Sequence, residues 1–388
     1  MPARHRSTAA VVVSALALLL GGCGGSATSA RSTSKPGAPA GHATTTTATT
    51  APVAPGGPVD IYSHDMAGDL APQLLNVPPR VYVPESAGRG IDVIDPSTMK
   101  VIDRYDTGLD PQHIVPSWDL STLYVTNDLG NSLTPIDPMT GKPKGPNIKL
   151  PDPYNLYFTT DGRYAIVVEE ARRILAFRDA HTFALVKDVP VACRGVDHAD
   201  FSADGRSAFF SCEFSGQMVK VDIPSMTVDG YLDIAGSSMQ DVKLDSAGTT
   251  LYSADMKRGG VYLIDPKSFT VKGFIPTGRD AHGLYISRNT KDLYVTNRGS
   301  GTVSVIDLAS QKVVQTWTIP GGGSPDMGNV SADGTVLWVS GRYNACVYAI
   351  STVDGHLIAK IPVPNEPHGL AVWPQPGRYS LGHTGIMR

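Results

Sequence analysis

The sequence predicts an all-β fold, a seven-bladed β-propeller of four-stranded antiparallel blades, and two independent repeats carry that prediction. A short apolar run closes each unit at intervals of 42 to 44 residues, and its last residues are Asp95, Asp137, Asp179, Asp222, Asp265, Asp307 and Ser351. Strand-like tetrads keep the same register and begin at Tyr82, Tyr124, Ile166, Phe209, Tyr252, Tyr294 and Trp338. Self-similarity at this period indicates a propeller, a solenoid or an array.

Each unit divides into four short strands, which favours the propeller among these architectures. In one full unit the predicted strands cover residues 283–287, 292–297, 302–306 and 312–319, with turn sequences between them. The β-branched and aromatic residues of the tetrads suit buried central strands. Forty Gly and 30 Pro fit a fold with many tight turns.

The two ends of the repeat predict how the ring closes. Residues 80–108 supply a second, third and fourth strand without a first, whereas 369–373 has the first-strand pattern with no complete blade after it. Joining them completes the seventh blade and removes an open sheet edge. Residues 380–388 are left over, and we expect them to plug or flank the closure.

The N-terminus has the features of a lipoprotein export signal. Arg4 and Arg6 precede an apolar stretch over residues 9–20, which is too short to span a bilayer, and Leu-Gly-Gly-Cys ends at Cys23. This resembles the bacterial lipobox, in which the Cys is lipidated. We therefore predict a signal peptide over residues 1–22, a lipidated and disordered tether over 23–58, and the propeller over 59–388.

Composition bears on the partners of the protein. Removing residues 1–22 takes away two Arg and no acid, so the charge from Lys, Arg, Asp and Glu is 31 − 36 = −5. A negative balance disfavours nucleic-acid binding through phosphate neutralisation. We expect an exported monomer, anchored by lipid on the extracytoplasmic face of the cell membrane, with an envelope protein or a small molecule as its partner.

Polar pairs precede the first strand of each unit and define the candidate site. Because first strands are innermost in a propeller, these pairs should ring one mouth of the channel, beside the ends of the tetrads. The predicted ligand-binding rim consists of His113, Asn155, Asp197, His198, Gln240, Asp241, His282, Asp326, His368, Glu213, Arg298 and Arg342. His383 could reach it from the chain end.

The tetrads Tyr-Val-Thr-Asn at residues 124–127 and 294–297 match the YVTN motif, and the repeat resembles the bacterial YVTN-repeat, YncE-like propellers over about residues 76–388. Four of the seven tetrads depart strongly from the motif. The resemblance implies the fold. Relatives include binding proteins, lactonase-like enzymes and the d1-haem propeller of nitrite reductases, so it implies no single activity.

Three interpretations of the rim follow. The first is a non-catalytic ligand-binding or scaffold module without a cofactor, because no catalytic motif is present and a tether presents the propeller. The second is a transition-metal or d1-haem-type site, with His198, His282 and His368 as metal ligands. The third is lactonase-like hydrolysis by His and Glu at the channel mouth, through His282 or Glu213.

Three cysteines follow Cys23. An exported protein experiences an oxidising compartment, so Cys193 and Cys212 are predicted to form a disulfide at the start of one blade. The alternative is a metal site formed by these two cysteines with His198 and Glu213. Cys346 lies in a strand pattern and is predicted to be a buried free thiol.

Overall fold

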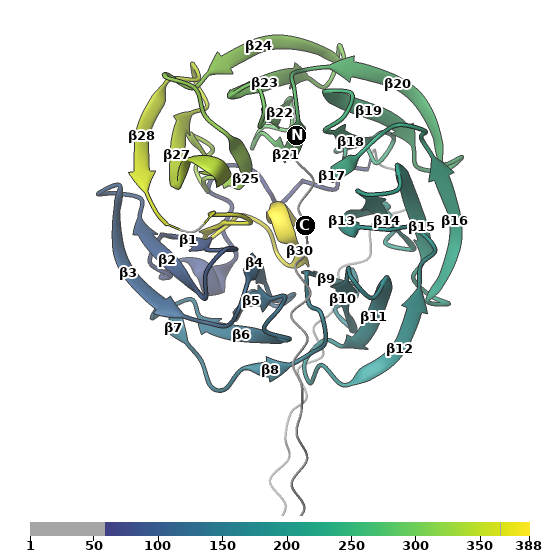
Figure 1. Cartoon of the computed structure of the whole chain (residues 1–388), viewed down its shortest axis with the longest axis horizontal. Helices are drawn as coiled ribbons and strands as arrows, with labels where there is room; N and C mark the ends of the chain where they lie inside the picture. The colour runs from purple at the N-terminus through teal and green to yellow at the C-terminus, as the bar shows by residue number, and fades with distance from the viewer. Residues whose placement is uncertain (1–58, 365) are drawn as a thin grey trace, which may run out of the picture. The chain divides into compact units, whose positions relative to one another are not determined.

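The computed structural model describes residues 59–364 and 366–388, and their regular secondary structure is almost wholly β-strand. Seven sheets surround a central channel (Figure 1), which confirms the predicted seven-bladed propeller. The signal peptide and tether predicted over residues 1–58 lie outside the described residues. Within the described part of the chain, no helix has the length and apolar character needed to cross a bilayer.

Six blades are built from consecutive strands, with the first strand innermost and the last at the circumference (Figure 1). Their bounds are β4 (Pro111–Pro116), β5 (Leu123–Asn127), β6 (Ser132–Asp137) and β7 (Lys142–Pro143), with β8 (Ile148–Lys149) beside β6; β9 (Asn155–Phe158), β10 (Tyr164–Glu169), β11 (Ile174–Asp179) and β12 (Leu185–Pro190); β13 (Val196–Phe201), β14 (Ser207–Cys212), β15 (Gln217–Asp222) and β16 (Thr227–Asp233); β17 (Met239–Leu244), β18 (Leu251–Asp255), β19 (Gly260–Asp265) and β20 (Thr270–Pro276); β21 (Ala281–Ile286), β22 (Asp292–Asn297), β23 (Thr302–Asp307) and β24 (Lys312–Thr318); and β25 (Pro325–Val330), β26 (Val336–Gly341), β27 (Cys346–Ser351) and β28 (Leu357–Pro362).

The seventh blade closes the ring from both ends of the described chain, as the repeat predicts. Its order is β29 (Ala371–Trp373), β1 (Arg80–Pro84), β2 (Gly90–Asp95) and β3 (Lys100–Asp106). The register pairs Val81 with Val372 in an antiparallel ladder. This pairing covers the edge of β1 that would otherwise lack a strand partner and could pair with another chain.

Burial explains why the repeat has its sequence pattern. The second and third strands are packed on both faces against neighbouring blades, so β22 and β23 are nearly all buried. The outermost strands alternate instead, and β3 has every second side chain in solvent. One apolar cluster joins Tyr285 and Val303 of one blade to Leu337 and Tyr348 of the next. Stacking adjacent blades therefore makes the core.

The last segment of the chain enters the channel. It forms β30 (Ser380–Gly382), the 3-10 turn η3 (His383–Gly385) and β31 (Ile386–Met387), and it lies at the centre of the ring (Figure 1). Gly382 pairs with Tyr157 at the inner edge of β9. Two further 3-10 turns, η1 (Pro72–Leu74) and η2 (Arg342–Asn344), lie outside the blades' ladders. Of the two roles expected for residues 380–388, the structure shows the plug.

Candidate functional site

A β-bulge positions the polar pairs of the sequence repeat. In β4 the pairing passes from Pro111–Asn127 to Ile114–Val125, so Gln112 and His113 lie opposite the single residue Thr126. The same shift occurs in four other inner strands, β13, β17, β21 and β25. A bulge adds one residue, bends the strand and re-aims its side chains. It therefore turns the polar pairs into the channel.

The third residue of the tetrad explains how the bulge is tolerated. The His113 N–H donates to the hydroxyl of Thr126 at 3.0 Å, and the Gly283 N–H donates to Thr296 at 2.8 Å. Ser211 accepts in the same way from the N–H of His198. A buried backbone N–H without a partner would be costly. The Thr of the YVTN motif thus provides a hydrogen-bond acceptor for the backbone N–H of the bulge, from which the channel residues project.

Five histidines from distant parts of the sequence meet in the channel. His113 comes from β4, His198 from β13 and His282 from β21, while His368 precedes β29 and His383 lies in the C-terminal turn η3. All five are buried, with exposed fractions between 0% and 4%. These side chains are shielded from solvent because the C-terminal segment fills the channel beside them.

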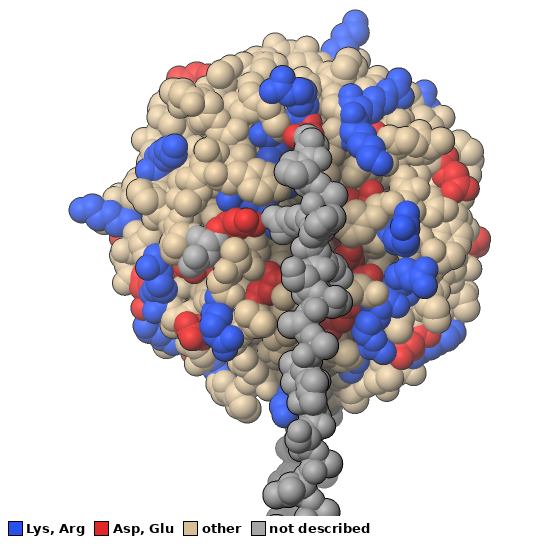
Figure 2. All heavy atoms as spheres, in the orientation of Figure 1, with Lys and Arg blue, Asp and Glu red and all other residues tan. Residues whose placement is uncertain are grey.

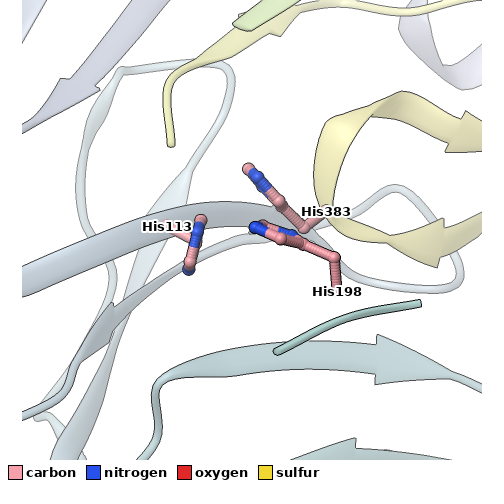
Figure 3. Close-up of side chains that lie close together, drawn as sticks. All are labelled: His113, His198 and His383. Atoms are coloured by element: carbon pink, nitrogen blue, oxygen red, sulfur yellow. The ribbon is translucent and has the colours of Figure 1, made fainter. Parts of the chain in front are cut away.

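The rings are in direct contact with one another. The centroid of His113 lies 4.1 Å from that of His383 and 4.8 Å from that of His368, and His198 lies 5.4 Å from His383. His282 is farther away, at 6.3 Å from His198 and 6.4 Å from His368. Figure 3 shows the side chains of His113, His198 and His383 close together, with the rings of His198 and His383 side by side. The ligand atoms of these three lie within 4.8 Å of one another.

The hydrogen bonds around His113, His198 and His383 determine which ring nitrogens offer a lone pair. The Nδ1 of His113 lies 2.8 Å from the carbonyl oxygen of Tyr154, which can only accept, so Nδ1 carries the proton and Nε2 keeps its lone pair. Among the described residues, that Nε2 and both ring nitrogens of His383 are buried without a hydrogen-bond partner. The Nε2 of His198 also has no partner, but the Asn155 side-chain amide donates to the Nδ1 of this ring at 3.4 Å, so His198 must move its proton to Nδ1 to offer Nε2 to a metal. A metal-bound imidazole typically donates its other N–H to a carbonyl or carboxylate, as His113 does to Tyr154.

A second group consists of His282, Asp326 and His368, whose ligand atoms also lie within 4.8 Å of one another. Asp326 is 3.0 Å from the Nδ1 of His282, and its other oxygen is 3.9 Å from the Nε2 of His368. Gln112 accepts from the Nδ1 of His368 at 2.8 Å, which leaves the Nε2 lone pair facing the carboxylate. The three predicted metal ligands are thus divided, with His198 in the first group and His282 and His368 in the second.

Burial keeps the imidazoles neutral. It lowers the pKa of His113 to about 3 and holds the pKa values of His198, His282, His368 and His383 well below the usual 6.5. A neutral imidazole has one lone pair, and such a cluster has no charge to repel a cation. Burial, and next the neighbouring Glu213, hold the pKa of Asp197 well above its usual value.

The remaining rim residues divide between the histidine cluster and the structural framework. Asn155 approaches the Nδ1 of His198 at 3.4 Å, and Asp197 lies 3.2 Å from its Nε2 without the alignment of a hydrogen bond. Gln240 donates to the carbonyl oxygen of Ser238, which immediately precedes its own strand β17. Asp241 accepts from the Leu284 N–H of the next blade at 2.9 Å, which joins two inner strands.

Charged side chains above the cluster mark the channel mouth. Arg298 and Arg342 approach Asp326 at 3.3 and 3.6 Å and are only partly buried. Glu213 is partly exposed, and burial raises its pKa. Figure 2 shows acidic and basic side chains interspersed over the exposed part of one face of the propeller.

The d1-haem alternative does not fit the channel. A tetrapyrrole needs an open pocket with an axial ligand directed into it. Here the ring centroid of His113 lies within 5.5 Å of those of His198, His368 and His383. The imidazoles occupy the space that a macrocycle would need. A single metal ion bound between the imidazole rings would need far less space than a macrocycle.

Cys193 and Cys212 form a disulfide, in agreement with the prediction, and Cys346 is a buried free thiol. The disulfide joins the segment before β13 to the last residue of β14, which Glu213 follows in the chain. Because both sulfurs are in the disulfide, the alternative metal site of Cys193, Cys212, His198 and Glu213 is wrong.

Replacing both Cys193 and Cys212 by serine is expected to destabilise the propeller by about 3 kcal/mol, because the disulfide closes a loop with a sequence separation of 19. Urea unfolding of the double variant and of the wild type, with and without reductant, measures the effect. A Cys346→Ser variant controls for loss of a buried sulfhydryl. A double variant as stable as the oxidised wild type would contradict the expectation.

Asp128, beside the mouth, predicts a pH dependence. Burial, and next the neighbouring Asp152 carboxyl, raises the pKa of Asp128 to about 8. In an unfolded chain Asp titrates near 4, so between about pH 4 and 8 the folded state holds a proton that the unfolded state lacks. The contribution of the Asp128 carboxyl to the free energy of unfolding is therefore lost as the pH rises from about 4 to 8. We expect Asp128→Asn to remove this loss, worth about 1 kcal/mol after allowance for partial exposure. Thermal melts at pH 5 and 8 would test it, and equal slopes for both proteins would contradict it.

Other functional candidates emerge only from the structure. Lys243, Asp200 and Arg388 lie buried below the cluster, where Arg388 pairs with Asp200 at 2.8 Å and Lys243 bonds to Thr384 at 2.5 Å. His383 belongs to the group with His113 and His198, but the repeat pattern could not place it there because it lies after the last blade. The one indication in the sequence is that this histidine lies in the segment left over after ring closure.

Comparison with known proteins agrees with the fold. A family model described as a YNCE-like beta-propeller matches residues 69–376. An uncharacterized protein YncE of Salmonella typhi is 24% identical over 280 residues, which cover 64% of this chain and 73% of that protein. A candidate 6-phosphogluconolactonase from Bacteroides fragilis NCTC 9343 superposes with a TM-score of 0.62 at 17% identity, over 78% of this chain and 100% of that one. The dihydro-haem d1 dehydrogenase NirN, in complex with DHE, gives a TM-score of 0.57 at 14% identity, over 75% and 74%. Likeness at these identities shows the fold alone.

Proposed function

The chain belongs to the YNCE-like β-propeller family, and we propose that it is an extracytoplasmic, lipid-anchored binding protein that holds a divalent transition-metal ion in its channel. One observation carries the proposal. The ligand atoms of three buried, uncharged imidazoles, those of His113, His198 and His383, lie within 4.8 Å of one another, and each ring has a nitrogen without a hydrogen-bond partner among the described residues. Burying such nitrogens without a hydrogen bond is costly, and a metal ion would satisfy them together.

The donor set favours Cu²⁺ or Zn²⁺, since imidazole suits both and a three-His site is a known arrangement for a metal with an open position. When bound, the ion would supply Lewis-acid or ligand-exchange chemistry at that position. His113 would be oriented by the Tyr154 carbonyl, and the C-terminal turn would bring His383 to the ion. We propose a binding role and no hydrolysis step, because the likeness to a candidate lactonase supports the fold only and carries no activity over to this chain.

Metal titration of protein purified without a polyhistidine tag tests the proposal. We expect wild-type protein to bind Cu²⁺ or Zn²⁺, and His198→Ala to bind at least about 100-fold more weakly, since replacing a residue that only orients a metal ligand already lowers metal affinity by about 10- to 100-fold. His356→Ala is the matched control, because His356 is exposed on an outer loop, with 62% of its side chain accessible. Wild-type affinity no greater than that of His198→Ala would overturn the proposal.

The proposed location rests on the N-terminal sequence, where Cys23 ends the lipobox-like motif. We expect wild-type protein in the membrane fraction of the producing cells, releasable by detergent, and Cys23→Ser protein in the soluble extracytoplasmic fraction. Fractionation with immunoblotting measures both. Equal release of the two proteins without detergent would contradict lipid anchoring.

A further inference from the structure

We propose that the channel holds two adjacent metal ions rather than one, with His282, Asp326 and His368 as the second site; this rests on the proposed function of the first. The second group meets the same geometric test, since its three ligand atoms lie within 4.8 Å of one another and all three residues are buried. Two imidazoles and one carboxylate are a common ligand set for transition metals.

The hydrogen bonds of the second group leave an electrostatic mismatch. The Nε2 of His368 faces an oxygen of Asp326 at 3.9 Å, and that oxygen accepts no hydrogen bond. The Nδ1–H of His368 already donates a hydrogen bond to Gln112, so its Nε2 carries a lone pair. This lone pair faces a lone pair of the Asp326 oxygen in a buried space. A cation between them removes the mismatch. Arg342, at 3.6 Å from the same oxygen, balances the carboxylate charge without filling that space.

The two proposed metal sites are adjacent. The rings of His113 and His368 lie 4.8 Å apart between centroids and belong to different groups, and His198 lies 6.3 Å from His282. Ions bound in both groups would therefore be neighbours. Paired ions in adjacent sites are a recurrent protein arrangement.

Copper is the ion that the second site favours. The thioether of Met327 lies 3.0 Å from the Nδ1 of His282, at the edge of the group. Thioether sulfur is a soft donor that selects Cu(I), and imidazole accepts both oxidation states of copper. The first group contains nitrogen donors alone. The second site should therefore distinguish copper from zinc more strongly than the first.

Copper stoichiometry and electron paramagnetic resonance test the pair. Protein titrated with Cu²⁺ is expected to bind two ions per chain, with a signal weakened by coupling between neighbouring Cu²⁺ ions. His383→Ala, in the first site, and His368→Ala, in the second, should each retain one ion with an uncoupled signal. His356→Ala should behave as wild type, and thermal melts confirm that each variant is folded.

The outcomes separate the two proposals. One ion per wild-type chain, lost in both His383→Ala and His368→Ala, would overturn the pair and leave a single shared metal site. One ion lost only in His383→Ala would likewise overturn the second site. No bound ion in any protein would overturn the proposed function itself. Zn²⁺ added in place of Cu²⁺ should reach a lower stoichiometry if Met327 contributes, and Met327→Leu should then abolish the difference.

Discussion

Substitution of Gly369 by alanine is expected to abolish tight metal binding, with a loss of at least about 100-fold, although it removes no ligand. A Cβ at this position would lie 2.1 Å from the Cδ2 of His113 and 2.8 Å from the Cε1 of His383. Neither ring can yield freely, because His113 is held by the Tyr154 carbonyl and His383 is buried in the plug. The methyl group must therefore separate two proposed ligands.

The matched control is Gly273→Ala, on the outermost strand β20, where an added Cβ meets no atom within 4 Å. Isothermal titration with Cu²⁺ and with Zn²⁺ measures both variants, and circular dichroism establishes that they are folded. If Gly369→Ala is folded and binds as the control does, the ion does not lie between these rings.

Replacing Arg388 by alanine is expected to destabilise the propeller by about 3–5 kcal/mol, the usual cost of leaving a buried charge without its partner. Arg388 donates to Asp200 at 2.8 Å, and both side chains are buried. Asp200 also accepts from the Leu244 N–H of the next blade at 2.8 Å, so it joins two inner strands to the plug. Lys243 lies close enough to offset part of the loss.

Urea unfolding measures this effect, with Lys142→Ala as the control. Lys142 pairs with Asp103 at the surface, where more than half of its side chain is exposed, and its loss should cost about 1 kcal/mol or less. A double variant, Arg388→Met with Asp200→Asn, should recover part of the stability by removing the uncompensated charge. Equal costs for Arg388→Ala and Lys142→Ala would show that the plug does not depend on this pair.

Much of the fold could be predicted from the sequence because each blade repeats the same local physics. The tetrads at Tyr124 and Tyr294 are strands in the predicted register, and the antiparallel pairing of Val81 with Val372 closes the ring as expected. The disulfide of Cys193 with Cys212 follows from strand pairing within one blade. These features depend on residues that are near neighbours in a repeat.

The site was less predictable because it depends on the width of the channel and on a segment outside the repeat. The polar pairs do face the channel, but the bulge and the plug bury them, so His113 and His198 contact other rings instead of water. No periodicity could place His383 beside them, or divide His198 from His282 and His368. Such contacts join blades that are far apart in sequence.

Anomalous diffraction from crystals of the protein grown with Cu²⁺, recorded on both sides of the copper edge, would locate bound copper ions. We expect a strong anomalous peak inside the channel, bounded by His113, His198 and His383, with a second beside His282, Asp326 and His368. Peaks confined to surface histidines such as His356, with none in the channel, would contradict it.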